Sequence, residues 1–290
     1  MKNWILVAAP VALLASAPHW IEALGGRADR DSQGRIVAVN LRASWVSDGD
    51  LVELAALPKL ERLNLSQTRI TDQGLTYLKT APALREVNLS YAEKIGDPAH
   101  AVIRDWKHLQ RLSLRGTVVA DETAASAASL PNLESLDIAD TIVGDVGFEA
   151  LTLSPGLKEL AMGNIRISES GYQSLRQFTA LESLDLSGGR HRGFTTLKDD
   201  AVAAIASMKR LRVLKLGHVR FPAKTMVILA TLPKVERLNL EFCPEVGDDA
   251  LRHLTSWKSL RWIDLHGTKV TAEGVASLRG QRPDCKILWE

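Results

Sequence analysis

The fold is decided by one stretch of the chain, Leu60–Ala83, which reads LERLNLSQTRITDQGLTYLKTAPA. Leu63 and Leu65 lie two residues apart, so on an extended strand both side chains face the same side. Leu75 and Leu78 lie three residues apart, which places them on one face of a helix, and the proline that follows ends this helix. The unit therefore has an apolar strand side and an apolar helix side, and it cannot bury either of them alone.

The same pattern recurs almost to the C-terminus. Successive strand starts are separated by 24 or 25 residues, with one exception, a gap of 30 residues after Leu181. The predicted strand starts are Ile36, Leu60, Leu84, Leu109, Leu133, Leu157, Leu181, Leu211, Val235, Leu260 and Cys285. Because stacked copies bury their apolar sides against one another, we predict an α/β solenoid with about eleven parallel strands on one side and helices on the other.

The two ends of the repeat array, residues 42–282, need different elements. Residues 18–41 are expected to form an N-terminal cap, made of a short helix, a hairpin and the first strand, which would cover the open end of the core. Residues 283–290 have the start of a strand and no helix after it, so we expect a C-terminal edge strand there.

The first 17 residues differ from the rest. Lys2 precedes an uncharged run, Trp4–Ala17, that ends in the small-x-small pattern of a signal-peptidase site. We interpret residues 1–17 as an export signal, which predicts a periplasmic, envelope or secreted protein. The alternative is an apolar helix, retained as an anchor or packed on the first repeat, in a cytoplasmic protein. The run is shorter than the roughly 20 residues that a membrane-spanning helix needs, so no membrane span is expected.

Composition and motifs limit the function classes. The formal net charge of +2 is too balanced to favour nucleic acid as a partner, and the 2 cysteines exclude a disulfide framework. The sequence has no His-Glu-x-x-His, Cys-x-x-Cys or Gly-x-Ser-x-Gly motif, and its 7 histidines are scattered over different units. We therefore predict no enzymatic activity, no cofactor and no metal.

The motif in Leu60–Leu78, with its Thr-x-Ile-Thr-Asp-x-Gly-Leu core, resembles a leucine-rich repeat. It is most similar to the ribonuclease-inhibitor-like, cysteine-containing subclass of the bacterial type, and the resemblance covers residues 20–290. It implies a curved, right-handed horseshoe with parallel strands on the concave face and helices on the convex face. It also implies binding of other macromolecules, but it transfers no individual binding residue.

Candidate contact residues are the strand positions that point away from the core, together with the turn residues next to them. Arg and Trp are frequent hot-spot residues in interfaces. Arg237 precedes Trp262 by one strand in the same column, which predicts a cation–π contact. The alternative is that the charges are merely solvated and that Trp262 packs near Ile287. The candidates are Arg62, Arg111 and Arg115 in a basic N-terminal part, Asp137 and Asp185 in an acidic middle, and Arg237, Phe242, Trp262 and His266 near the C-terminus.

The long gap after Leu181 contains an insertion within Gly188–Thr196. Inserted loops of solenoids gather on one rim, which is often the binding rim, so we add Arg190, His191 and Arg192 to the candidates. The alternative is a tolerated flexible loop. Nucleotide binding is not expected, because Phe194 stands where a phosphate-binding loop needs lysine.

These observations predict a non-enzymatic scaffold that binds another protein through the concave face and the inserted rim loop. Two alternatives stay open. An exported envelope protein would bind polysaccharide, with Trp262, Phe242 and Tyr91 stacking on sugars. A subunit of an enzyme complex would use the repeats to recruit a substrate.

Overall fold

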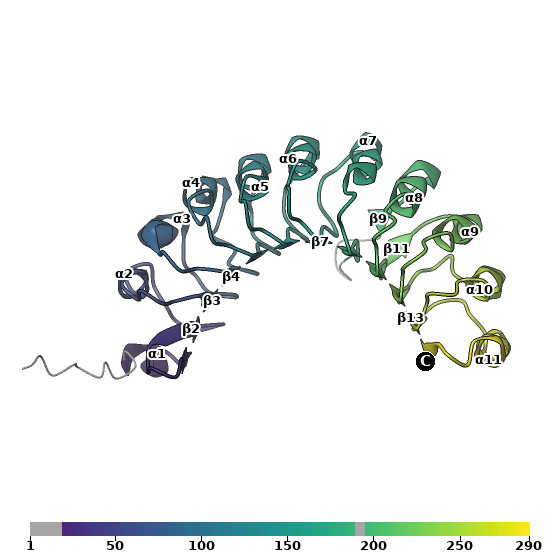
Figure 1. Ribbon diagram of the computed structural model, residues 1–290, viewed down its shortest axis with the longest axis horizontal. Coiled ribbons are helices and arrows are strands. Elements are labelled where there is room, and N and C mark those ends of the chain that lie inside the picture. Colours follow the sequence, from purple (N-terminus) through teal and green to yellow (C-terminus); the bar gives the residue numbers. More distant parts are fainter. Residues whose placement is uncertain (1–18, 189–194) are drawn as a thin grey trace, which may run out of the picture.

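The computed structural model describes residues 19–188 and 195–290. The predicted export signal, and the candidates Arg190, His191 and Arg192 in the insertion, lie outside the described residues. The chain forms an arch with its strands on the inner side and its helices on the outer side (Figure 1). The predicted α/β solenoid is confirmed.

The inner side of the arch is one continuous sheet. Within the described residues this sheet has 12 strands, and β1 (Arg27–Arg30) pairs antiparallel with β2 (Ile36–Asn40). From β2 onward, neighbouring strands pair in parallel without a shift in register. These further strands are β3 (Arg62–Asn64), β4 (Glu86–Asn88), β5 (Arg111–Ser113), β6 (Ser135–Asp137), β7 (Glu159–Ala161), β8 (Ser183–Asp185), β10 (Val213–Lys215), β12 (Arg237–Asn239), β13 (Trp262–Asp264) and β14 (Lys286–Leu288).

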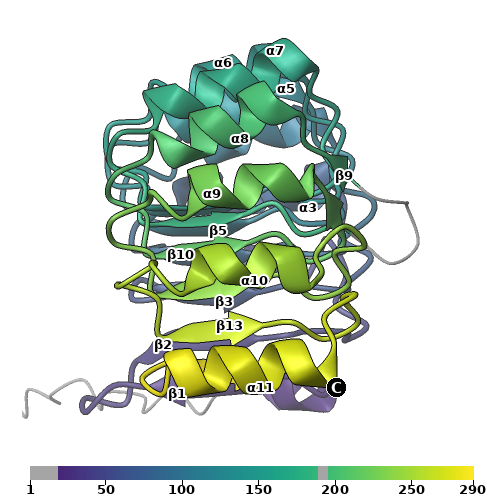
Figure 2. The same cartoon turned by 90° about the vertical axis from the view of Figure 1, so that its right-hand side faces the viewer.

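The outer side carries one short helix or helical turn for each unit. Figure 2 shows α9, α10 and α11 running side by side. The α-helices are α1 (His19–Ala23), α2 (Leu51–Ala55), α3 (Asp72–Leu75), α4 (His100–Ile103), α5 (Asp121–Ala128), α6 (Asp145–Leu151), α7 (Glu169–Gln173), α8 (Asp199–Ala206), α9 (Met226–Leu229), α10 (Asp248–Leu254) and α11 (Ala272–Gln281). Short 3-10 segments cover Thr76–Thr80, Asp97–Ala99, Ser174–Gln177 and Ala223–Thr225. A small second sheet pairs β9 (Thr195–Thr196) with β11 (Val219–Arg220) in parallel.

The core lies between the strands and the helices. Leucines such as Leu63 and Leu75 are buried, as the spacing of the repeat predicted. Trp106 and Trp257 lie in the helix layer, and each donates its indole N–H to a backbone carbonyl of the preceding unit at 2.9 Å. A buried indole needs such a partner, so these tryptophans join neighbouring units as well as filling space.

An aspartate of each regular unit holds the next unit in place. The Asp48 carboxylate accepts the backbone N–H of Thr71 at 2.8 Å and its hydroxyl at 2.6 Å. Gly74 passes close to this carboxylate, and a Cβ added there would lie 2.7 Å from Cγ of Asp48. The Thr-Asp-x-Gly part of the motif therefore has a structural cause. The same backbone N–H contact is accepted by Asp72 from Gly96, by Asp97 from Ala120, by Asp121 from Gly144, by Asp145 from Ser168 and by Asp248 from Thr271.

In the units beside the insertion, the equivalent carboxylates form ion pairs with lysines. Glu169 and Asp199 occupy the corresponding slots, and they form ion pairs with Lys198 at 2.5 Å and with Lys224 at 2.8 Å. Exposed pairs of this kind contribute about 0–1 kcal/mol, whereas the carboxylates of Asp48, Asp72, Asp97 and Asp121 satisfy part-buried backbone donors.

Arg282 closes the C-terminal end of the core. Its guanidinium is buried and donates to the carbonyl oxygens of Leu254, Trp257 and Leu260 at 2.6–3.0 Å. It also forms an ion pair with Asp284. Leu254 is the last residue of α10, and Trp257 and Leu260 lie in the segment between α10 and β13.

Candidate functional site: the concave face

Side chains alternate between core and concave face along each short strand. On β3, Leu63 is buried, Arg62 is exposed and Asn64 is half-buried. In the later strands the middle residue is likewise buried and its neighbours are exposed or half-buried, apart from the buried Asp264, so the candidate strand residues lie on the concave face as expected. Within the described residues Arg62 makes no ion pair or side-chain hydrogen bond, and it borders a trough in the N-terminal half of the lining.

The last residue of most strands has a structural role that was not predicted. The side-chain oxygen of Asn64 accepts the backbone N–H of Ser66 at 3.0 Å, which turns the chain away from the sheet. Asp137 and Asp185 do the same for Ala139 at 3.1 Å and Ser187 at 2.9 Å. The available signal was the recurrence of Asn or Asp in this slot, at Asn40, Asn64, Asn88, Asp137, Asp185, Asn239 and Asp264.

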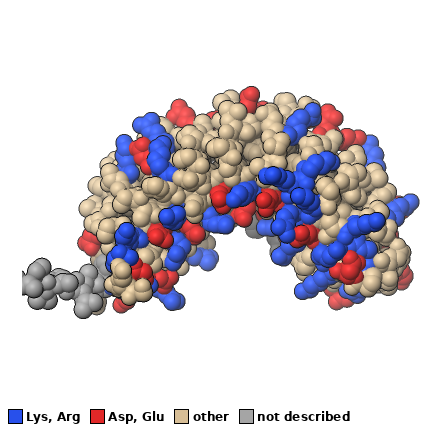
Figure 3. Space-filling model, in the orientation of Figure 1, with Lys and Arg blue, Asp and Glu red and all other residues tan. Residues whose placement is uncertain are grey.

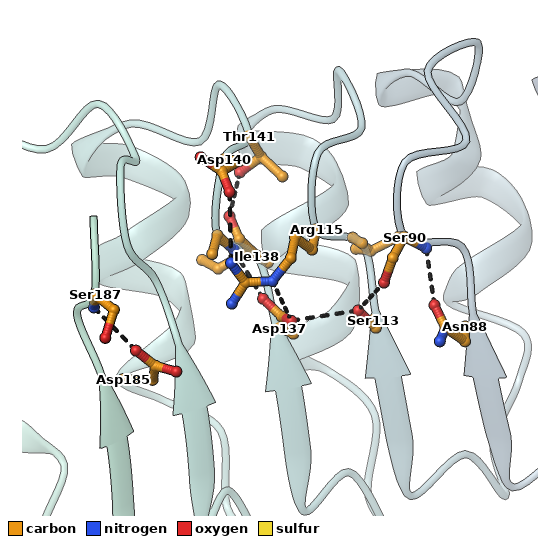
Figure 4. Close-up of polar contacts among 12 residues, drawn as sticks. Asn88, Ser90, Ser113, Arg115, Asp137, Ile138, Asp140, Thr141, Asp185 and Ser187 are labelled. Atoms are coloured by element: carbon orange, nitrogen blue, oxygen red, sulfur yellow. Dashed lines mark hydrogen bonds and ion pairs between the residues drawn. The ribbon is translucent and has the colours of Figure 1, made fainter. Parts of the chain in front are cut away.

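The middle of the lining is an internally paired network (Figure 4). Arg115 donates to Asp137 at 2.9 Å and lies 3.4 Å from Asp140. Burial raises the pKa of Asp137, and the Arg115 guanidinium opposes this rise without cancelling it. Burial would lower the pKa of Arg115, but the Asp137 carboxylate more than offsets this and raises it. On the other side of Asp137, the Ser113 hydroxyl donates to the carboxylate at 3.4 Å. The Ser90 hydroxyl lies 2.7 Å from the Ser113 hydroxyl.

The other charges of this region are also paired within the chain. Arg111 reaches over one intervening strand to Glu159 at 3.0 Å, and Lys215 lies 3.3 Å from Asp185. Charges from the N-terminal part and from the middle of the lining are therefore partly paired with one another. The reason is that parallel strands place the residues of different units side by side, so opposite charges from distant parts of the sequence meet.

The C-terminal half contains the predicted cation–π contact. Arg237 and Trp262 are register partners on β12 and β13, and the guanidinium carbon lies 5.1 Å from the centroid of the Trp262 ring. Arg237 is exposed and Trp262 is half-buried. Within the described residues Arg237 makes no ion pair, so its charge is balanced only by the ring beneath it.

The remaining C-terminal candidates lie beyond the C-terminal ends of the strands, whereas Arg237 and Trp262 are the first residues of β12 and β13. Phe242 stacks on His218 with 4.7 Å between ring centroids and an interplanar angle of 18°. His266 lies 2.6 Å from the buried carboxylate of Asp264. Four residues of extended chain separate Trp262 from His266, which corresponds to roughly 13 Å. The structure thus divides the candidates into an Arg237–Trp262 pair at the strand starts and a His218–Phe242–His266 group at the strand ends.

Several cations lie just before the starts of the C-terminal strands. Figure 3 shows blue side chains gathered along the concave side of the C-terminal half. Arg212 and Arg261 are paired with Glu236 at 2.9 Å and with Asp284 at 3.0 Å. Arg210 and Lys234 make no ion pair within the described residues. A groove borders these cations, and it is lined by Glu182, Arg210, Arg212, Pro233, Lys234, Glu236, Ser259 and Arg261.

The described part of the chain contains no group of three His, Cys, Asp or Glu residues that could hold a metal ion. Cys243 and Cys285 are free thiols, and Cys243 is buried. No helix in residues 19–188 or 195–290 is long and apolar enough to cross a membrane.

Comparisons with known proteins agree with this geometry. The Leucine Rich repeat family model matches residues 56–79, which include the stretch that carries the motif. A search of curated proteins found no match. The crystal structure of an internalin from Listeria monocytogenes is similar with a TM-score of 0.52 and 17% sequence identity, over 82% of this chain and 69% of the internalin chain. At this identity the likeness concerns the fold alone. The protein is thus a solenoid of leucine-rich repeat type, with a repeat that the family model matches at residues 56–79.

Proposed function

We propose that this protein is a non-enzymatic scaffold that binds another protein, and that the contact centres on Trp262 and Arg237. The observation that carries the proposal is the exposed Arg237 guanidinium over the half-buried Trp262 ring, in a lining where most other charges are paired within the chain. Trp and Arg supply the largest energies in protein interfaces, and a prearranged pair loses little conformational entropy on binding.

Charge defines the kind of partner. Arg210, Lys234 and Arg237 have no ion-pair partner among the described residues; Arg210 and Lys234 line the groove before the strand starts, and Arg237 is the first residue of β12. An acidic protein surface would complement them, and it would approach faster at low salt. Arg111 pairs with Glu159, Arg115 with Asp137, and Asp185 with Lys215. We therefore assign these charges to stabilising the lining rather than to contact with a partner.

Export, the repeat subclass and the division of the chain are also proposals. The Lys2 and Trp4–Ala17 pattern supports export, and the Thr-Asp-x-Gly-Leu motif supports the ribonuclease-inhibitor-like subclass of the bacterial type. We further propose that residues 18–41 cap the array, residues 42–282 form the repeats and residues 283–290 form its last edge. The inserted loop with Arg190, His191 and Arg192 is a second contact candidate of this scaffold.

Affinity capture with quantitative proteomics tests the proposal. The bait is the purified chain, compared with a variant carrying Trp262→Ala and Arg237→Ala. A matched control carries Tyr77→Ala and Arg104→Ala, an exposed aromatic residue and an exposed arginine away from the concave face. A protein retained by wild type and control, and lost by the Trp262/Arg237 variant, supports the proposal. Equal retention of every protein by all three baits contradicts it.

Polysaccharide binding is the second candidate function, and the stacked Phe242 and His218 rings favour it. Tyr91 gives a similar ring near the other end, where it is exposed over Gly116. Binding to a glycan array that is lost with Phe242→Ala, and kept with Trp262→Ala, would select this function. The third hypothesis, recruitment of a substrate to an enzyme, gains no support from the described residues.

A further inference from the structure

A stripe of exposed side chains runs along the rim that follows the strand ends in the N-terminal half. Each unit contributes one residue to it, the one immediately before the last core-packed apolar residue of the segment that leads from the strand turn to the helix. The members of this rim stripe are Trp45, Arg69, Lys94, Val118, Ile142 and Arg166. Backbone hydrogen bonds connect neighbouring units at this level, from Val118 to Ile95 at 3.0 Å and from Ile142 to Val119 at 3.2 Å.

The stripe exposes more apolar surface than the fold requires. Trp45 is 77% exposed, Val118 50% and Ile142 38%. The Arg69 guanidinium lies over the Trp45 ring at 5.2 Å from its centroid, so the indole is held in place while it remains accessible. Large exposed apolar side chains gathered on one rim are typical of an interaction site.

A groove at the N-terminal end of the stripe gives the site its charge. Trp45, Arg69 and Lys94 line it together with Gln67 and several hydroxyl groups. The carboxylate in the lining is Asp48, and both of its oxygens already accept hydrogen bonds from Thr71. Within the described residues Arg69 and Lys94 make no ion pair. The groove therefore presents two cations that form no ion pair among the described residues, Arg69 over the accessible indole and Lys94 in the same groove.

We propose that the rim stripe is a second binding surface, which takes an acidic segment of a partner protein that carries apolar side chains. The cations would meet carboxylates of the segment, and Trp45, Val118 and Ile142 would meet its apolar side chains. A protein segment fits better than an acidic polysaccharide, because two aliphatic residues continue the stripe beyond the groove. At roughly 4.8 Å per unit the stripe spans roughly 24 Å, the length of about seven residues of extended chain.

Labelled octapeptides of defined sequence test this surface by fluorescence anisotropy. One peptide has four Asp residues followed by four Leu residues (the Asp-Leu peptide), a second has four Lys followed by four Leu (Lys-Leu), and a third has four Asp followed by four Ser (Asp-Ser). The protein variants are Arg69→Glu with Lys94→Glu, Trp45→Ala, and Val118→Ser with Ile142→Ser. A matched control carries Arg104→Glu with Lys107→Glu, the same change of charge at exposed cations outside the stripe.

We expect the Asp-Leu peptide to bind wild type and control with affinities within twofold of each other. We expect the Arg69/Lys94 variant and the Trp45 variant to bind it at least tenfold more weakly, and the Val118/Ile142 variant several-fold more weakly. The Lys-Leu and Asp-Ser peptides should bind wild type at least tenfold more weakly than the Asp-Leu peptide. Circular dichroism identifies any variant that fails to fold, and the remaining variants then decide the result.

Equal binding of the Asp-Leu peptide by wild type and by all stripe variants would overturn the proposal, as would no binding to wild type. Binding of oligogalacturonate in preference to the Asp-Leu peptide would overturn the assignment to a protein segment. The Trp262→Ala/Arg237→Ala variant should bind the peptide like wild type, so failure of the rim proposal and failure of the concave-face proposal are distinguishable.

Discussion

Arg237 lies over the ring of Trp262, with 5.1 Å between the guanidinium carbon and the ring centroid, and the two residues are register partners on neighbouring parallel strands. We expect the pair to stabilise the folded chain by about 0.5–1 kcal/mol, the range for exposed cation–π contacts. A double-mutant cycle with Arg237→Ala and Trp262→Ala, measured by urea denaturation, gives this coupling. A coupling of zero would mean that the two side chains are only neighbours.

The contact between Asp48 and Gly74 predicts an unusual sign for a helix substitution. Replacement of glycine by alanine in a helix normally stabilises by up to about 1 kcal/mol. At Gly74 the added Cβ would displace the Asp48 carboxylate from Thr71, so we expect Gly74→Ala to lower the free energy of unfolding by about 1–2 kcal/mol. Gly280→Ala in α11 is the control, because a Cβ there meets nothing within 4 Å. If both variants are stabilised, the steric account of the motif is wrong.

Asp97 should contribute to acid unfolding. Burial alone would raise the pKa of Asp97, but hydrogen bonds from Thr123 and from the Ala120 amide hold it below the ordinary value of 3.8. A lowered pKa in the folded state means that the stabilisation is present above pH 3.8 and is lost as the pH falls through the folded-state pKa.

Asp97→Asn keeps an acceptor oxygen for both backbone amides and removes the titration. We therefore expect a smaller loss of unfolding free energy between pH 7 and pH 3 in this variant than in wild type. Urea denaturation at the two pH values measures both losses. Identical losses would show that the Asp97 pKa is not lowered on folding.

Arg282 is expected to stabilise the C-terminal end of the solenoid. Arg282→Ala removes the guanidinium bonds to three carbonyl oxygens, of which those of Leu254 and Trp257 keep a backbone N–H donor, and hydrogen bonds to charged groups contribute about 1.5–3 kcal/mol each. We expect a loss of about 2–4 kcal/mol, together with faster amide hydrogen exchange in α10 and α11 than in α5. Uniform exchange along the solenoid would contradict a local capping role.

The two cysteines should differ in reactivity. Burial raises the pKa of the Cys243 thiol to about 12, so it should stay protonated and protected in the native protein. Cys285 is half-buried, and burial raises its pKa as well. We expect a thiol reagent at pH 8 to label Cys285 slowly and Cys243 only after unfolding. Rapid labelling of Cys243 in the native state would show that the unit around it opens.

Much of the fold could be predicted because the repeat encodes it locally. The spacing of Leu63, Leu65, Leu75 and Leu78 determines which sides are buried, and the recurrence every 24 or 25 residues determines how units stack. The same logic predicted the Arg237–Trp262 contact, since both residues occupy the same position in consecutive units.

The charge pattern of the lining was less predictable from the sequence than the fold. Arg111 meets Glu159 across an intervening strand, and Arg115 meets both a strand residue and a turn residue of the next unit. Such contacts depend on the side-chain conformations and on the curvature of the sheet, which no local pattern specifies. Trp45 was missed because it lies at a turn position that carries polar residues in several other units.

A protein partner is proposed to contact the C-terminal half of the concave face. Photo-cross-linking tests it most directly, with p-benzoylphenylalanine in place of Trp262 and, as the control, in place of Tyr77 on the helix side. We expect a cross-linked protein from position 262 that unmodified wild type competes away, and none from position 77. A cross-link from position 77 alone, or no protein cross-link from position 262 with a partner shown to bind, would contradict it.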